Sequence, residues 1–282
     1  MMADLILQSP VLDALVVEKI AALSMGSGVQ ELGPTVARVL QADLSAREQV
    51  KALCDKHRID FAYLEQIHWL KDCKLLAMDM DSTLINIECI DEIAAIAGRG
   101  EQVAQITAAA MRGEIKDFKH SLIERVKLLQ GVPAEALEQV YEQRLQLNYG
   151  AERLIEQARQ QGIYTLLVSG GFTFFTERLQ ARLGLDQVQA NTLEIVDGVL
   201  TGRVLGPIVD GAAKAQYVAE RARKLDAQPE QMIAIGDGAN DLQMMQHTYY
   251  SVAYRAKPVV QEQARFALNY CGLDAVLNWF RT

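Results

Sequence analysis

The sequence predicts an α/β fold, in which a parallel β-sheet carries an inserted group of helices and follows a small α+β unit. Three short apolar runs each predict a strand that is buried on both faces of the sheet: residues 75–78, 164–168 and 232–235. Each run is followed by a polar residue or glycine, which indicates where the strand ends. Four segments with helical periodicity separate the first two runs, where a crossover needs only one helix. Residues 1–70 alternate strand and helix patterns of their own.

Charge and cysteine usage narrow the class of protein. The 282 residues carry a formal net charge of −8 without a basic block, which argues against a nucleic-acid partner. No apolar run approaches the roughly 18 residues of a membrane helix, and the first ten residues show no signal-peptide pattern. The four cysteines form no Cys-x-x-Cys pair. We therefore expect reduced thiols, no zinc site, no membrane partner and a cytoplasmic location.

The first 70 residues predict a small β-α-β-α-β unit, with Ser45 as the N-cap of its second helix. Its elements are expected at residues 3–7, 11–23, 36–40, 45–56 and 59–64. This unit holds no combination of catalytic residue types. It could bind a regulator, serve in dimerisation or only pack against the rest.

Two carboxylates one residue apart, Asp79 and Asp81, follow the first apolar run. They are not expected inside a buried strand, because desolvating two unpaired charges is costly. We therefore place them where the strand leaves the sheet, which is where open α/β sheets bind ligands. Taken alone, the same residues would suit a solvated turn with an N-cap equally well.

Residues 86–148 predict a helical cap over the ends of the strands. Its helices are separated by glycine or proline and are expected at 90–97, 103–111, 118–129 and 134–147. In the alternative arrangement these helices would pack on one face of the sheet. A cap is favoured because the insertion begins directly after the two carboxylates.

The second strand and a later helix supply donors for an anion. Ser169-Gly170-Gly171 precedes a helix and would present backbone N–H groups to an anion, although Gly-Gly also suits a simple turn. Lys214 is expected in the first turn of a helix that ends at residue 225. A lysine is unfavourable at this positive helix end, so either an anion lies in front of it or the lysine is solvated.

Other segments complete the predicted core. Asp197-Gly198 between two strand patterns predicts a hairpin with a type I′ turn. The remaining elements are helices at 151–160 and 174–183, hairpin strands at 192–196 and 200–204, a strand at 251–254, a short helix from Pro258 and a closing helix near Leu277.

The third apolar run is followed by Gly236-Asp237-Gly238-Ala239-Asn240-Asp241, which repeats the pattern of strand, sharp turn and acids. The carboxylates of Asp79, Asp81 and Asp237 would suit Mg²⁺, which prefers oxygen ligands. Ser169, the N–H groups after it and Lys214 would donate to phosphate. A carboxylate beside phosphate can be a nucleophile, and a second one nearby can be a general acid and then a base.

These motifs resemble those of the haloacid dehalogenase superfamily phosphatases: Asp79-Met-Asp-Ser-Thr, Ser169-Gly-Gly, Lys214 and Gly236-Asp-Gly-Ala-Asn-Asp. Residues 85–92, 118–125, 168–172 and 235–241 look most like the branch that hydrolyses phosphoserine. The resemblance implies a Rossmann-like core (71–85 and 149–282), a helical cap (86–148) and an ACT-like N-terminal domain (1–70) that looks too short to be complete.

The resemblance also implies roles for the core residues. Asp79 would be the nucleophile and Asp81 the general acid and base. Mg²⁺ would be bound by Asp79, Asp237 and the backbone carbonyl of Asp81. Ser169, Gly170, Gly171 and Lys214 would hold phosphate, and Asn240 would contact phosphate or water. Asp241 would orient Lys214 and the groups around the metal.

In the cap, the resemblance implies that Glu88 binds the ammonium of the substrate and Arg125 its carboxylate. Met111 and Phe118 would cover the apolar part of the substrate. Without the resemblance, Met111 and Phe118 would be assigned to an ordinary helix core, and Glu88 and Arg125 to solvated surface charges.

The implied activity is hydrolysis of O-phospho-L-serine to L-serine and phosphate through an aspartyl phosphate, as the last step of serine biosynthesis. One alternative is a phosphotransferase that passes phosphate to another small alcohol such as homoserine. Another is a non-catalytic regulator that binds a small molecule, which the presence of both Asp79 and Asp81 disfavours. A homodimer is left open.

Overall fold

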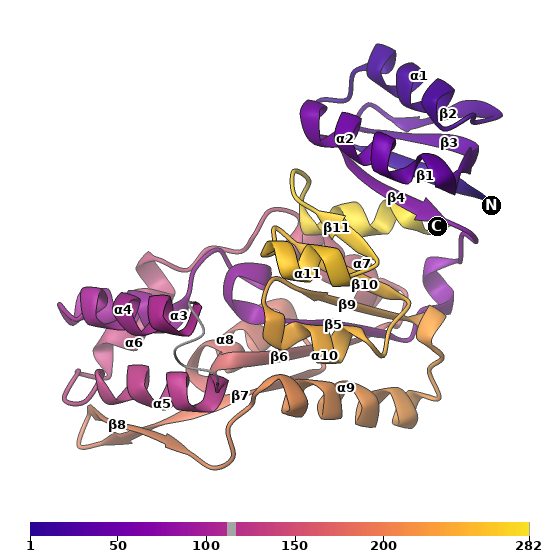
Figure 1. The fold of residues 1–282 in the computed structure, drawn as a ribbon. Helices are drawn as coiled ribbons and strands as arrows, with labels where there is room; N and C mark the ends of the chain where they lie inside the picture. The colour runs from indigo at the N-terminus through magenta and orange to yellow at the C-terminus, as the bar shows by residue number, and fades with distance from the viewer. Residues whose placement is uncertain (112–116, 282) are drawn as a thin grey trace.

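The structure is a computed structural model that describes residues 1–111 and 117–281. Figure 1 shows three parts: a central sheet with helices on both faces, a group of helices at one end of the sheet, and a separate small unit that holds the N-terminus. The α/β class, the helical insertion and the small N-terminal unit are as the sequence predicted.

The central sheet has seven strands in the order β11-β10-β9-β5-β6-β7-β8. All neighbouring pairs are parallel except β7 and β8, which form the predicted hairpin. The strands are β5 (Leu75–Met78), β6 (Tyr164–Phe172), β7 (Gln187–Val196), β8 (Val199–Leu205), β9 (Met232–Gly236), β10 (Tyr250–Tyr254) and β11 (Phe266–Leu268). The three apolar runs are therefore the three central strands, β9, β5 and β6.

Helices cover both faces of this sheet, which explains why β5 is apolar at every position. Leu75 and Ala77 share a buried cluster with residues of α9 (Gly211–Leu225). Leu76 and Met78 share another with α7 (Ala151–Gln160) and α8 (Thr173–Leu183). The chain ends with α10 (Leu242–Met245), α11 (Pro258–Gln263) and a 3₁₀ helix, Leu273–Trp279, at the place of the expected closing helix.

One detail of the core differs from the prediction, and another confirms it. Strand β6 continues through Ser169-Gly170-Gly171 to Phe172, because an irregular pairing with β7 carries the strand past the glycines. The hairpin turn is of the predicted type, since both of its central residues have positive φ, 50° at Asp197 and 77° at Gly198.

The cap contains the four predicted helices: α3 (Cys89–Ile96), α4 (Gly100–Met111), α5 (Phe118–Lys127) and α6 (Glu135–Gln143). The segment between α5 and α6 pairs with β8, where the Leu200 N–H donates to the Val132 carbonyl at 2.8 Å. The amide of Asn148 donates to the carbonyls of Thr83 and Ile85, and so joins the two chain segments that connect cap and core. The cap thus lies at one end of the sheet (Figure 1).

The N-terminal unit has the element order β-α-β-β-α-β, which is typical of ferredoxin-like units. Its elements are β1 (Met2–Gln8), α1 (Ala14–Leu23), β2 (Gly28–Gly33), β3 (Val36–Asp43), α2 (Arg47–His57) and β4 (Asp60–Leu64), and the antiparallel sheet has the order β2-β3-β1-β4. The expected β-α-β-α-β order was wrong, because the structure adds strand β2.

The missed strand β2 exposes nearly every residue, so it lacks the apolar alternation that marks a strand. The predicted N-cap at Ser45 was also wrong. The side chain of Asp43 accepts a hydrogen bond from the Ser45 N–H at 3.0 Å and caps a short 3₁₀ turn, and α2 begins only at Arg47.

Polar and apolar contacts attach the N-terminal unit to the core. The buried carboxylate of Asp60 accepts hydrogen bonds from the backbone N–H groups of Asn269, Tyr270 and Cys271, at 2.7–3.0 Å. Leu64 belongs to the same buried cluster as Trp279 of the core.

All four cysteines are free and buried. Among the described helices, none has both the length and the apolar character needed to span a membrane.

Candidate active site

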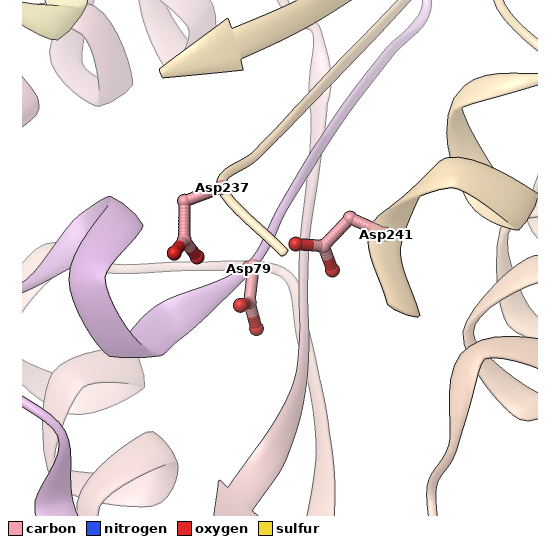
Figure 2. Close-up of side chains that lie close together, drawn as sticks. All are labelled: Asp79, Asp237 and Asp241. Carbon is pink, nitrogen blue, oxygen red and sulfur yellow. The ribbon is translucent and has the colours of Figure 1, made fainter. Parts of the chain in front are cut away.

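The carboxyl ends of β5 and β9 bring three carboxylates together (Figure 2). Asp79 follows β5 directly, and Asp237 and Asp241 come from the turn after β9. One oxygen from each lies within 4.8 Å of the others. The chain leads from β5 to β6 on one side of this pair and from β9 to β10 on the other side. The carboxyl ends of β5 and β9 are therefore a topological switch point, where an open α/β sheet forms a ligand crevice.

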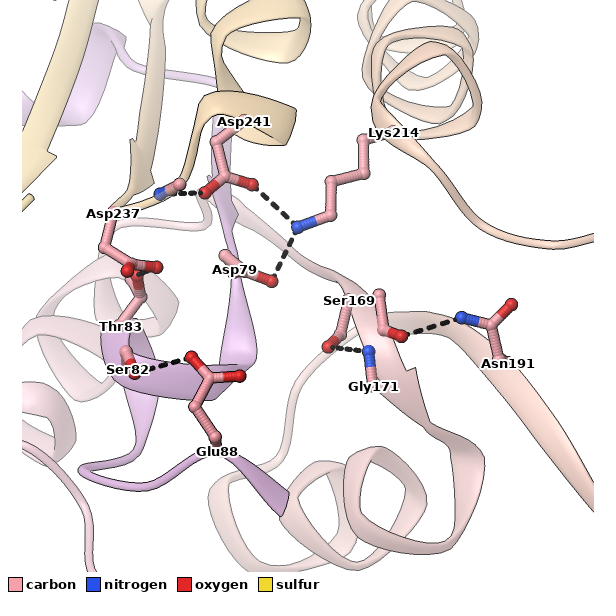
Figure 3. A network of polar contacts seen from close by, with 12 residues as sticks. Asp79, Ser82, Thr83, Glu88, Ser169, Gly171, Asn191, Lys214, Asp237 and Asp241 are labelled. Atoms are coloured by element: carbon pink, nitrogen blue, oxygen red, sulfur yellow. Dashed lines mark hydrogen bonds and ion pairs between the residues drawn. The ribbon is translucent and has the colours of Figure 1, made fainter. Parts of the chain in front are cut away.

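Lys214 contacts this cluster and is fully buried. Its Nζ is 2.7 Å from Asp79 Oδ1 and 2.7 Å from Asp241 Oδ1 (Figure 3). Burial alone lowers the pKa of Lys214, but the charges of Asp241 and Asp79 outweigh it and raise that pKa, so the ammonium stays charged. The alternative of a solvated lysine is therefore wrong, and two carboxylates explain a lysine in the first turn of α9.

Among the described residues, the ammonium of Lys214 does not balance the burial and mutual repulsion of these acids. Burial first, and then the charge of Asp241, raise the pKa of Asp79 well above its ordinary value. Burial, Asp241 and Glu88 likewise raise the pKa of Asp237 to about 7. Carboxylates that repel one another in a buried place are stabilised by a bound cation. The donor set is all oxygen, so it fits a hard cation.

Asp81 lies on the turn that follows β5, beside the first helix of the cap. Its Oδ1 accepts a hydrogen bond from the backbone N–H of Cys89 at 3.2 Å. Burial, followed by the charge of Glu88, raises the pKa of Asp81 to about 7. A Cβ atom at Gly171 would lie 2.5 Å from Asp81 Oδ2, so this approach of β6 to the carboxylate requires glycine.

The end of β6 forms another wall of the site. The hydroxyl oxygen of Ser169 accepts a hydrogen bond from the Gly171 N–H at 2.8 Å, so this backbone donor is already engaged. The buried Asn191 donates to the carbonyl of Gly170 at 2.8 Å and accepts from the N–H of Val209 at 2.8 Å. It therefore joins the end of β6 to the chain that leads into α9.

The sequence did not point to Asn191. Its partners lie 21 and 18 residues away, and only the fold brings them together. The available signal was a polar residue directly before an apolar hairpin strand.

The cap supplies the outer side of the site. The ring of Phe118 lies so close to Gly170 that a Cβ there would be 2.7 Å from Phe118 Cζ. Arg125 Nε donates to the carbonyl of Ser121 at 3.3 Å, and Glu88 Oε1 accepts from the hydroxyl of Ser82 at 2.8 Å (Figure 3). An ion pair at 3.1 Å between Lys119 and Asp210 connects α5 to the N-cap of α9.

These walls enclose a cavity of about 860 Å³. Of the residues that the sequence singled out, those lining it are Asp79, Asp81, Glu88, Phe118, Arg125, Ser169, Gly170, Gly171, Asp237 and Asn240. Lys214 and Asp241 are fully buried. Lys214 contacts both Asp79 and Asp241 and so joins the two carboxylates. Met111 is the last residue of α4, and its side chain lies outside what the structure describes.

Comparisons with known proteins show which family the chain resembles. The family model for haloacid dehalogenase-like hydrolases matches residues 76–246, and a model for a domain of unknown function matches residues 5–50. A phosphoserine phosphatase from Polaromonas sp. is 55% identical over 212 residues, which cover 74% of this chain and 90% of the relative.

Two solved structures extend the comparison. A probable phosphoserine phosphatase from Vibrio cholerae is 36% identical, with a TM-score of 0.84 over 98% of this chain and 86% of that one. A structure described as a phospho-aspartyl intermediate analogue of phosphoserine phosphatase is 37% identical, with a TM-score of 0.69 over 74% of this chain and 99% of that one. The chain belongs to the haloacid dehalogenase-like hydrolase family.

Proposed function

We propose that this protein is a phosphoserine phosphatase, which hydrolyses O-phospho-L-serine to L-serine and phosphate. The observation that carries the proposal is the position of Asp79 at the base of the cavity, between a buried ammonium and two carboxylates. The names of the relatives support the choice of substrate. In this role the protein would act in the cytoplasm, at the last step of serine biosynthesis.

In the first half-reaction, Asp79 is the nucleophile. Lys214 engages its Oδ1, so the other oxygen attacks phosphorus. A bond forms between this oxygen and phosphorus while the bond from phosphorus to the serine oxygen breaks. Asp81, whose pKa is about 7, gives its proton to the departing oxygen as general acid.

In the second half-reaction, Asp81 acts as a base. It takes a proton from water, and the resulting hydroxide attacks phosphorus. The bond to Asp79 then breaks, which releases phosphate and regenerates the carboxylate. Ser169, Lys214 and Asn240 would hold the phosphate oxygens, and Asp241 keeps Lys214 in place.

We propose Mg²⁺ as the cofactor. Asp79 and Asp237 would hold it, together with the backbone carbonyl of Asp81, and Asp241 adds a carboxylate to the same cluster. When bound, Mg²⁺ neutralises charge on the phosphate oxygens and lets an anionic substrate approach these acids.

The cap would select the amino-acid part of the substrate. Arg125 has the planar shape that grips a carboxylate through two hydrogen bonds, and Glu88 can receive an ammonium. Phe118 would cover the apolar carbon atoms between these groups. Both charged residues line the same cavity as Asp79, so one small amino-acid phosphate can meet all of them.

Phosphate release from a panel of phosphomonoesters, with and without Mg²⁺, tests the proposal. Phosphoserine is expected to give the highest kcat/KM, and only with the metal. Adding homoserine or another alcohol separates hydrolysis from transfer, since a phosphotransferase would form a new phosphomonoester in place of phosphate. No release from any compound in the panel would favour a non-catalytic regulator.

A further inference from the structure

Ser82 stands in a conformation that serine rarely adopts. It lies in the turn Met80–Leu84 with φ 57° and ψ −3°, which is the left-handed region that favours glycine. Its N–H donates to the carbonyl of Ile87 at 3.1 Å, and this bond brings the turn back toward the start of α3. The backbone conformation alone would favour glycine at this position. The presence of serine therefore indicates a role for its side chain.

The hydroxyl of Ser82 donates to Glu88 Oε1 at 2.8 Å (Figure 3). Glu88 is the N-cap residue of α3, but its side chain makes no capping hydrogen bond to that helix. The side chain of Asp81 accepts from the first helical N–H, that of Cys89, in its place. The carboxylate of Glu88 is thereby left free of the helix, and it lines the cavity.

We propose that Ser82 is a positioning residue, which fixes the carboxylate of Glu88 for the ammonium of the substrate. The hydroxyl occupies one carboxylate oxygen and leaves the other for the ligand. A long, exposed side chain loses rotamer freedom when it binds a ligand, and a bond made beforehand reduces that loss. The proposal rests on the proposed function, because it requires a substrate that carries an ammonium group.

Two variants separate the hydroxyl from the strained backbone. Ser82→Ala removes the hydroxyl and keeps a side chain at positive φ, whereas Ser82→Gly removes the hydroxyl and suits that φ. The readout is the ratio of kcat/KM for phosphoserine to kcat/KM for phosphoglycolate, which has no ammonium. We expect this ratio to fall about tenfold in both variants, mainly through KM for phosphoserine.

If Ser82→Gly keeps the ratio of the unmodified protein, the proposal is overturned. A fall in the ratio that is seen only in Ser82→Ala would then be due to the backbone. A second readout comes from the Glu88→Gln background, in which Ser82→Gly is expected to change the ratio no further. An additional tenfold fall there would show that Ser82 acts independently of Glu88.

The same assays separate this inference from the proposed function. If the unmodified protein releases no phosphate from phosphoserine, the proposed function and the inference both fail. If the unmodified protein prefers phosphoserine and Ser82→Gly keeps that preference, only the inference fails.

Discussion

The two sides of the cavity are held in different ways. On the core side, Lys214 is fully buried and contacts two carboxylates at 2.7 Å, and the buried Asn191 braces the end of β6. On the cap side, Glu88 is exposed and, among the described residues, is held by one hydroxyl, and Arg125 makes a longer bond of 3.3 Å to its own helix. The groups proposed for phosphate chemistry are thus fixed before substrate arrives, and those proposed for the amino-acid part make fewer bonds to the residues that the structure describes.

This difference predicts how substitutions should act. Preorganised charges lower the barrier for every substrate that brings a phosphate to the site, because they need not be rearranged during the reaction. Changes on the core side should therefore harm all phosphomonoesters alike. Changes on the cap side should alter the preference among them.

The largest effect is expected from Asp79→Asn. The amide cannot form the phospho-enzyme, so activity should fall by several orders of magnitude with every substrate. Brief incubation with labelled phosphoserine, followed by acid quench, should leave no hydroxylamine-sensitive label on the variant. Asp91→Asn is the control, because Asp91 lines the cap side of the same cavity. Label at the normal level on Asp79→Asn would assign the nucleophile elsewhere.

Removal of the metal should be nearly as damaging and equally independent of the substrate. Chelation should abolish phosphate release, because the carboxylates of Asp79 and Asp237 would then repel the phosphate, and added Mg²⁺ should restore it. Asp237→Asn should raise the Mg²⁺ concentration needed for half-maximal rate by at least about tenfold. Full activity after exhaustive chelation would remove the metal from the mechanism.

Arg125→Ala tests the cap side. It should lower kcat/KM for phosphoserine by about 2–3 kcal/mol, because a charged hydrogen-bonded contact to the carboxylate is lost. Phosphoethanolamine, which has no carboxylate, should be affected little. Lys127→Ala is the matched control, since Lys127 lies on the same helix with an exposed side chain that pairs with Glu124. Equal losses with both substrates would show that Arg125 does not bind the carboxylate.

Local patterns in the sequence were enough to predict where the carboxylates of the core side meet. Each apolar run marked a buried strand, and each strand end carried its acids or donors, so the meeting of Asp79 with Asp237 follows from a parallel sheet. The burial of Lys214 could not be decided in this way, because helix position alone allows a solvated lysine equally well. Its two short contacts depend on partners 135 and 27 residues away.

Contacts that lack a local signal were missed for the same reason. The bracing by Asn191 depends on the irregular pairing that carries β6 past two glycines, where glycine would ordinarily end a strand. Strand β2 has an exposed surface on nearly every residue, and a strand of this kind leaves no apolar alternation in the sequence. The two mistakes at β2 and Ser45 both fall in the N-terminal unit.

The N-terminal unit provides the smallest expected effect on activity. Among the described residues that line the cavity, none comes from residues 1–70, so we expect this unit to contribute stability and no chemistry. Asp60→Ala tests this in the full chain. The substitution leaves three backbone N–H groups without their buried acceptor, which should lower the free energy of unfolding by about 3 kcal/mol.

At 25 °C the folded Asp60→Ala variant should keep kcat/KM for phosphoserine within about twofold, since a loss of that size leaves most molecules folded in a typical protein. Urea denaturation measures the first quantity, and phosphate release measures the second. Asp13→Ala is the control within the same unit, because Asp13 caps α1 at an exposed position, and it should lower stability by only about 1 kcal/mol. If circular dichroism shows that the Asp60→Ala variant is folded but phosphate release shows that it is inactive, the N-terminal unit completes the active site. The cavity would then depend on three parts of the molecule, the core, the cap and the N-terminal unit.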